Sequence, residues 1–197
     1  MNLFKCASAS AILLASIFLS HSLINLLAFA ISTQTITQQM IPENLHPLIT
    51  SLIRHFVPIT QGMILTEALL GALIFFAFER IAKVRKLTTL RISSILALIA
   101  VLLSGISILF TIVSIPFPLA DKTISLCTGI VLIIFGSTLI KTKISSQNTL
   151  LTSLGILQIF QGLILISTFW IPARLLEFSI ATYILEAVFF WNIVKEK

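Results

Sequence analysis

Six apolar segments divide the chain, and each is about as long as a membrane-spanning helix. They cover residues 7–31, 58–78, 92–115, 123–140, 149–171 and 174–194. The hydrocarbon core of a bilayer requires roughly 20 apolar residues per helix. Stretches such as 95–103 are apolar on every face and lack the period-two alternation of barrel strands. The pattern therefore predicts an all-α integral membrane protein, a six-helix transmembrane bundle forming a single domain over residues 1–197.

Basic residues are distributed unevenly between the gaps that separate these segments. Arg54, Lys122 and Arg174 occupy one set of gaps, and the other ten of the 13 basic residues occupy the alternate set. Those ten are Lys5, Arg80, Lys83, Arg85, Lys86, Arg91, Lys141, Lys143, Lys195 and Lys197. Lys and Arg near the ends of spanning helices are retained on the cytoplasmic side. We therefore expect three hairpins with both termini in the cytoplasm, in the inner or plasma membrane.

The first apolar segment has some features of a cleavable leader. Lys5 precedes it, and Ala28-Phe29-Ala30 has the small-residue pattern of a cleavage site. However, the run is longer than the 7–15 residues of a usual leader core. His21 and Asn25 also lie four residues apart and so share one helix face. We expect the first helix to be retained, with cleavage as the alternative.

The longest polar gap, residues 32–57, is predicted to be an outer loop that contains a short amphipathic helix. Its apolar residues recur at helical spacing, and Pro47 suits the first turn of a helix because no N–H is needed there. Such a helix can lie in the membrane plane with its apolar face buried. The alternative is a lid over an outward-facing cavity, because long loops in compact folds are often functional.

The net charge of +6 accompanies a composition that is 57% hydrophobic and only 10% charged. Soluble domains contain about 25% charged residues. Because the basic residues are dispersed among predicted helix ends, we expect contact with anionic lipid headgroups on the cytoplasmic face, and no nucleic acid. The densest group comprises Arg80, Lys83, Arg85, Lys86 and Arg91, and a cytoplasmic protein partner could also dock there.

Polar residues inside the apolar segments are the strongest functional signal. Glu67 and Glu186 fall near the middle of their segments, where a charge costs roughly 2.5–3.5 kcal/mol. Each must be protonated, paired or exposed to a wet cavity. Other polar residues fall at similar depths, so we predict a substrate or proton site comprising Glu67, Glu186, His21, Asn25, Gln158, Gln161 and Tyr183. The alternative, mainly for the amides, is hydrogen bonding between helices.

Small residues recur at spacings that keep them on one helix face. In the first segment these are Ala7, Ala11 and Ala15, and the fourth and fifth segments contain Gly129/Gly136 and Gly155/Gly162. Such stripes let helix backbones approach closely. They predict packing within the chain or, for the alanines, docking of a separate membrane subunit.

No catalytic residue, metal or cofactor is expected. The nearest approach to a serine nucleophile motif is Gly105-Ile106-Ser107, which no second glycine follows. There is no H-E-x-x-H and no Walker A motif. Glu43, His46 and His55 share the outer loop, but their spacing matches no metal site that we can name.

These patterns favour a small transporter or a membrane-embedded substrate-binding subunit with a polar site at mid-membrane. A non-catalytic accessory subunit of a larger membrane complex is the alternative, and an intramembrane enzyme is the third hypothesis. In size, helix number, orientation and long first outer loop, the predicted architecture is similar to the substrate-binding subunits of energy-coupling-factor vitamin importers. The similarity covers no residue motif and therefore implies no site residue.

Overall fold

The computed structural model describes residues 2–32, 46–112, 118–144, 147–167 and 179–195. These residues form six helices and no strand: α1 (Asn2–Ser32), α2 (His46–Val84), α3 (Thr88–Ile112), α4 (Pro118–Lys141), α5 (Asn148–Ser167) and α6 (Ser179–Lys195). The first five are long and apolar enough to cross a membrane. The prediction of an all-helical chain with helices of spanning length is confirmed to that extent, and α6 is described over 17 residues.

Helix α2 differs from the prediction because it is 39 residues long. The predicted apolar segment begins at Pro58, and a proline inside a helix removes one backbone hydrogen bond. Instead the helix continues through Pro58 back to His46. The prediction of a separate amphipathic helix in the first outer loop was wrong, because that segment is the first part of α2. Pro47 lies in its first turn, where a proline is tolerated.

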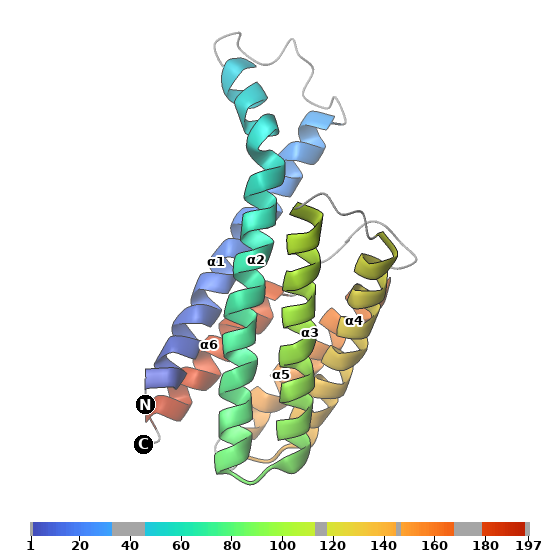
Figure 1. The fold of residues 1–197 in the computed structure, drawn as a ribbon. Helices are drawn as coiled ribbons and strands as arrows, with labels where there is room; N and C mark the ends of the chain where they lie inside the picture. The colour runs from blue at the N-terminus through green and yellow to red at the C-terminus, as the bar shows by residue number, and fades with distance from the viewer. Residues whose placement is uncertain (1, 33–45, 113–117, 145–146, 168–178, 196–197) are drawn as a thin grey trace.

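The six helices form a closed ring. Among the described residues, each helix contacts its neighbours in the sequence, and α1 also contacts α6. Helix α1 begins and α6 ends at the same end of the bundle, where α2 also turns into α3 and α4 into α5 (Figure 1). We call this end the base. One link that closes the ring is a hydrogen bond of 3.0 Å from the Ser8 hydroxyl to the Ala187 carbonyl.

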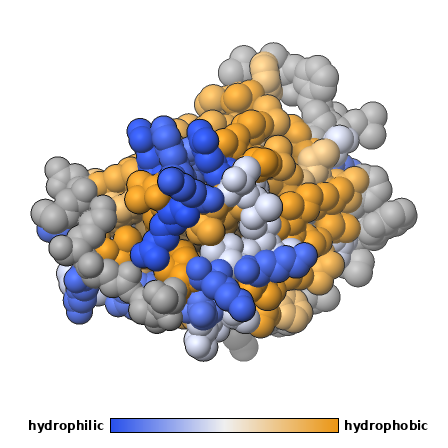
Figure 2. Space-filling model, turned by 90° about the horizontal axis from the view of Figure 1, so that it is seen from below, coloured by the Kyte–Doolittle hydropathy of each residue, from blue (hydrophilic) through white to orange (hydrophobic). Residues whose placement is uncertain are grey.

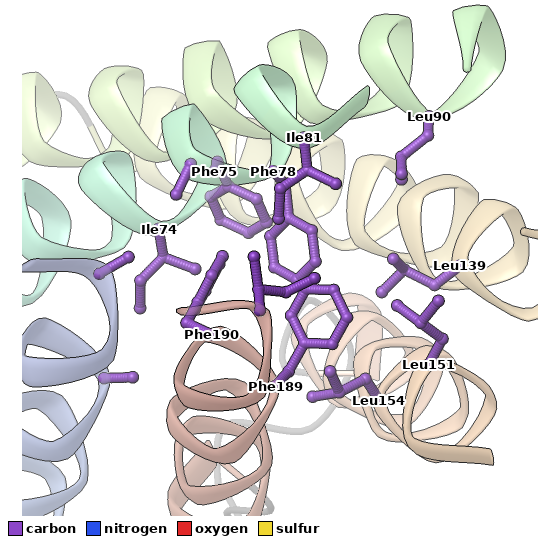
Figure 3. Close-up of a cluster of buried hydrophobic side chains, with 14 of the residues drawn as sticks. Ile74, Phe75, Phe78, Ile81, Leu90, Leu139, Leu151, Leu154, Phe189 and Phe190 are labelled. Carbon is purple, nitrogen blue, oxygen red and sulfur yellow. The ribbon is translucent and has the colours of Figure 1, made fainter. Parts of the chain in front are cut away.

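Towards the base, the inside of the ring is filled by the aromatic cluster, which we define as Phe75, Phe78, Phe135, Phe189 and Phe190. Figure 3 shows Phe75, Phe78, Phe189 and Phe190 of this cluster. The ring of Phe78 is central, with centroid distances of 5.3 Å to Phe135, 5.4 Å to Phe189 and 5.0 Å to Phe190. Aromatic pairs at such distances contribute about 0.5–1.5 kcal/mol each beyond their burial. The cluster therefore joins α2, α4 and α6 into one packed core.

Helices α4 and α5 approach each other at four glycines. A Cβ added at Gly162 would lie 2.5 Å from the carbonyl oxygen of Gly129, and one added at Gly155 would lie 2.5 Å from that of Gly136. Only hydrogen atoms fit between backbones at this separation. The seven-residue glycine spacing therefore marks a packing face within the chain, which was one of the two predicted uses of the small residues.

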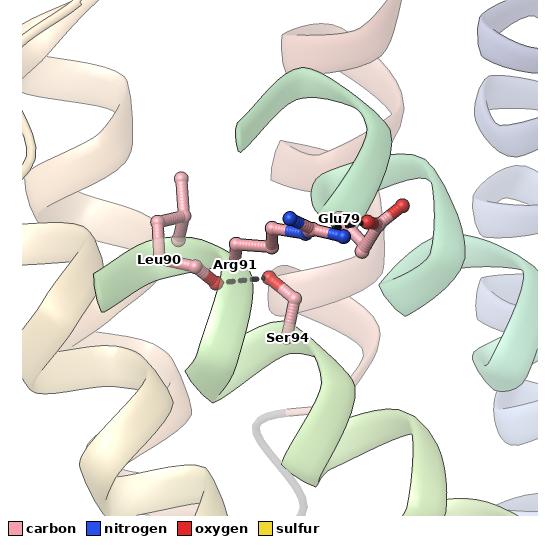
Figure 4. A network of polar contacts seen from close by, with 4 residues as sticks. All are labelled: Glu79, Leu90, Arg91 and Ser94. Carbon is pink, nitrogen blue, oxygen red and sulfur yellow. Dashed lines mark hydrogen bonds and ion pairs between the residues drawn. The ribbon is translucent and has the colours of Figure 1, made fainter. Parts of the chain in front are cut away.

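The turn from α2 to α3 at the base has the hydrogen bonds of a Schellman motif. The N–H of Leu87 bonds to the carbonyl of Ala82 at 2.8 Å, and the N–H of Lys86 bonds to that of Lys83 at 3.3 Å. Lys86 has a φ of 57°, a left-handed conformation that glycine normally adopts. Beside this turn, Arg91 Nε lies 3.0 Å from Glu79 Oε1 (Figure 4). The ion pair ties the start of α3 to the end of α2.

The outward faces of the helices are apolar. On α3, for example, Leu96, Ile99, Leu103, Ile106 and Phe110 are all exposed. A soluble monomer rarely exposes a continuous apolar surface of this kind. In a bilayer such faces contact acyl chains, and each helix satisfies its own backbone polar groups. The exposed surface and the helix lengths together suggest a membrane protein.

Candidate functional site: a polar cavity inside the helix ring

A cavity of about 200 Å³ lies inside the ring and is lined by residues from all six helices. Five of the seven residues predicted for the site line it, namely Glu67, Gln158, Gln161, Tyr183 and Glu186. They come from α2, α5 and α6. The structure thus brings together residues that are more than 100 positions apart in the chain. Their role as a binding site stays a prediction.

The best-defined polar contact in the cavity joins α5 to α6. The Gln158 amide nitrogen Nε2 donates a hydrogen bond of 3.0 Å to Glu186 Oε1. Both side chains are almost fully buried, with exposed fractions of 2% and 1%. The remaining oxygens, Gln158 Oε1 and Glu186 Oε2, are buried without a hydrogen-bond partner in the described part of the chain. Buried acceptors of this kind cost free energy unless something donates to them.

Glu67 reaches the cavity because of its position on α2. Ile64, Glu67, Gly71 and Ile74 recur three or four residues apart, and all four line the cavity. Gly71 has no side chain to fill the cavity, and a Cβ added there would contact Val101 Cγ1 at 3.4 Å. Helix α2 thus directs a carboxyl group inward from the side of the ring opposite α5, with two helices between them in either direction.

A hydroxyl pair that the sequence did not single out also lines the cavity. Ser104 Oγ on α3 lies 3.3 Å from Thr128 Oγ1 on α4, and it donates a hydrogen bond to the Ala100 carbonyl at 3.0 Å. A hydroxyl has only one proton, so when Ser104 donates to Ala100, Thr128 is the donor within the pair; otherwise either hydroxyl can donate. Serine and threonine are frequent in all the apolar segments, so composition alone did not distinguish these two.

Towards the base, the cavity ends on the aromatic cluster. Phe75 belongs to both, since its side chain lines the cavity and its ring centroid lies 5.1 Å from that of Phe135. On α6, Phe189 and Phe190 follow Glu186 within about one helical turn. The polar residues of the cavity are therefore adjacent to the aromatic cluster, which lies between the cavity and the base.

Several predicted residues lie outside the part of the chain whose side chains are described. His21 and Asn25 belong to α1, but the structure does not describe their side chains. From α1, the described residue that lines the cavity is Phe18. The side chains of His46 and His55, and Glu43 altogether, are also outside the described set. For these residues the predictions stay predictions.

The residues predicted for partner docking divide into two groups. Ala7 and Ala11 are completely buried, so both side chains are used in packing within the chain, while Ala15 is half-buried. The basic residues Arg80, Lys83, Arg85, Lys86 and Arg91 are all exposed. Figure 2 shows hydrophilic side chains gathered at the base, surrounded by apolar flanks. Arg80 also lies over the Phe76 ring, 5.2 Å from its centroid.

Comparisons with protein families, with curated proteins and with solved structures found no match for this chain. The functional argument therefore depends on the cavity and on the surfaces around it.

Proposed function

We propose that the chain is a multi-pass membrane protein that binds a small solute in the cavity, as a transporter or as the membrane-embedded substrate-binding subunit of one. One observation supports this more than any other. Glu67, Gln158, Gln161, Tyr183 and Glu186 are polar residues in apolar helices, and all five line a single interior cavity. Polar groups that served only to join pairs of helices would have no reason to share a cavity.

The depth of the hydrogen-bonded pair Gln158 and Glu186 supports the same proposal. Glu186 lies nine residues before Lys195 on α6, and Gln158 lies ten residues after Asn148 on α5. At a rise of 1.5 Å per residue these are distances of about 14 Å and 15 Å from the base. Half the thickness of a hydrocarbon core is also about 15 Å. A solute bound there would be halfway across the membrane, where carriers commonly hold their substrates.

We propose that the base faces the cytoplasm and that α6 is a sixth span. The exposed basic residues at the base support this orientation through the positive-inside rule. Reporter fusions after Lys86 and after the C-terminus test it. Both fusions are expected to report the cytoplasmic side, and a periplasmic or extracellular signal from either one would contradict the threading.

Solute binding can be tested with a cavity-filling variant. Purified protein in nanodiscs is screened by thermal shift against small cationic, neutral and anionic solutes. Val101 lines the cavity, whereas Leu103, two residues away on α3, is 48% exposed on the outer face. Any solute that raises the Tm of the native protein should have no effect on Val101→Trp and an undiminished effect on Leu103→Trp. Equal responses from both variants would place the binding outside the cavity.

An accessory subunit remains the second candidate, and the exposed basic residues at the base are the observation that favours it. In this case Arg80, Lys83, Arg85 and Lys86 would contact an acidic surface of another subunit. Replacing all four by Gln should then abolish co-purification of a stoichiometric partner. If the protein is a lone carrier, the same replacement should leave solute binding unchanged.

A further inference from the structure

We infer that the cavity binds a small organic cation, a protonated amine attached to an apolar group. This inference depends on the proposed function, because it names the class of solute that the cavity takes. Three independent features of the cavity support it: its charge, its unpaired acceptors, and its walls and size.

The ionisable side chains described around the cavity are acidic. Glu67 and Glu186 line it, and none of the described residues around it is a lysine, an arginine or a histidine. Another acidic residue of α2, Glu79, is paired with Arg91 at the base (Figure 4). The Glu186 carboxylate, 1% exposed among apolar helices, requires a positive charge or a proton. A cationic solute would supply that charge.

The buried polar atoms of the cavity also call for a donor. Gln158 is oriented by its hydrogen bond to Glu186 Oε1, which leaves Gln158 Oε1 and Glu186 Oε2 as acceptors without partners in the described structure. A neutral or anionic acceptor group on a ligand could satisfy neither oxygen. An ammonium group has three N–H donors and no acceptor. Its donors match what these two oxygens lack.

The walls and size favour an organic cation over a metal ion. More than half of the described lining residues are apolar, among them Phe18, Phe75 and Leu132. A hard metal ion such as Ca²⁺ is usually bound by several carboxylates together, and the described residues contain no group of three His, Cys, Asp or Glu side chains that could hold a metal ion. An apolar cavity of about 150 Å³ accommodates benzene. A cavity of about 200 Å³ has room for such a group together with an aminoalkyl chain.

The test uses three probes of the same size that differ in charge: 2-phenylethylamine, which is protonated at neutral pH, 2-phenylethanol and phenylacetate. Binding is measured by calorimetry on the full chain in phosphatidylcholine nanodiscs, so that lipid charge does not contribute. The amine is expected to bind at least about tenfold more tightly than the alcohol, and phenylacetate is expected not to bind. This ranking is measured on the native protein and does not depend on the folding of any variant.

Variants then connect the charge preference to the named atoms. Glu186→Gln and Gln158→Leu are each expected to weaken amine binding by about tenfold or more, as loss of a hydrogen bond to a charged group does. Glu79→Gln is the matched control, because it makes the same change at a glutamate of the base that does not line the cavity. This variant should bind the amine as tightly as the native protein.

The outcomes separate this inference from the proposed function. If the alcohol or phenylacetate binds as tightly as the amine, or if the solutes that bind in the wider screen are neutral or anionic, the cavity is not specific for cations, and the proposed function stands. If no solute of any charge binds in the cavity, both proposals fail. If Glu79→Gln weakens amine binding as much as Glu186→Gln does, the amine binds elsewhere.

Discussion

The half of the bundle near the base and the half around the cavity are built from the same helices in opposite ways. On α6, Glu186 is followed about one turn later by Phe190, and on α2, Gly71 is followed one turn later by Phe75. In the half near the base, Phe78, Phe135, Phe189 and Phe190 leave no exposed surface. The half around the cavity retains about 200 Å³ of space and buried oxygens that have no partner among the described residues.

This difference indicates how the chain tolerates an interior that costs stability. Empty volume and unpaired acceptors are both destabilising. Sites that bind ligands commonly accept such costs, which close packing elsewhere must offset. The aromatic cluster and the glycine contacts between α4 and α5 are the described features that can provide this compensation.

The largest effect should come from the aromatic cluster. Phe78→Ala is expected to lower the free energy of unfolding by about 3–5 kcal/mol, because the cavity it leaves cannot collapse among rings fixed on α4 and α6. The measurement is reversible unfolding in mixed detergent micelles. The matched control is Phe110→Ala, since Phe110 is 49% exposed on α3 and its loss should cost less than about 1 kcal/mol. Equal losses from the two variants would mean that the cluster does not hold the base together.

The glycine contact should show the next largest effect. The methyl group of Gly162→Ala would lie 2.5 Å from the Gly129 carbonyl oxygen and force α4 and α5 apart, at an expected cost of about 1–3 kcal/mol. Gly62 has nothing within 4 Å of an added Cβ, so Gly62→Ala should instead raise the free energy of unfolding by about 0.5–1 kcal/mol. A loss in Gly62→Ala that equals the loss in Gly162→Ala would rule out contact distance as the cause.

The cavity half should respond in the opposite direction. Glu186→Gln removes a buried ionisable group while keeping its shape, and it is expected to raise the free energy of unfolding by about 1 kcal/mol. The control Glu79→Gln breaks the partly exposed pair with Arg91 and should lower the same quantity by about 0.5 kcal/mol. Both values come from the same unfolding titration. A clear loss of stability in Glu186→Gln would show that the carboxyl group is structural.

The smallest effect concerns the turn that closes the base. Lys86 adopts φ 57°, so Lys86→Gly should raise the free energy of unfolding by about 0.5–1 kcal/mol by removing backbone strain. Lys83 lies within α2, where Lys83→Gly should lower it by a similar amount. Both variants replace one lysine by glycine, so the comparison isolates the effect of the left-handed conformation at Lys86. Changes of the same sign would refute it.

The number and type of helices could be predicted from the sequence because a bilayer demands a fixed length of apolar residues. The start of α2 could not be predicted from the sequence. A proline such as Pro58 usually marks a helix boundary in water, but inside a membrane protein neighbouring groups can satisfy the carbonyl that it leaves unbonded. The rotation of each helix about its own axis could not be predicted either. On α3, for example, apolar residues occur on every face, so the sequence did not show that Ser104 faces inward and Leu103 outward.

The candidate site was more visible than the helix orientations because ionisable and amide side chains are rare in apolar segments. Glu67, Gln158 and Glu186 could be singled out on that ground, and each lines the cavity. Their pairing could not be predicted, because the hydrogen bond between Gln158 and Glu186 depends on how α5 and α6 face each other. The glycine spacing likewise predicted a contact face but not which helix would occupy it.

The four glycines between α4 and α5 have a consequence for how this protein can change over generations. At Gly129, Gly136, Gly155 and Gly162 any substitution adds atoms where another backbone already lies. Ile130 and Ile134 lie on the outer face of α4 and can be replaced by any apolar residue at little cost in stability. In a saturation mutagenesis experiment, the most intolerant sites of this pair of helices would therefore be those with the smallest side chains.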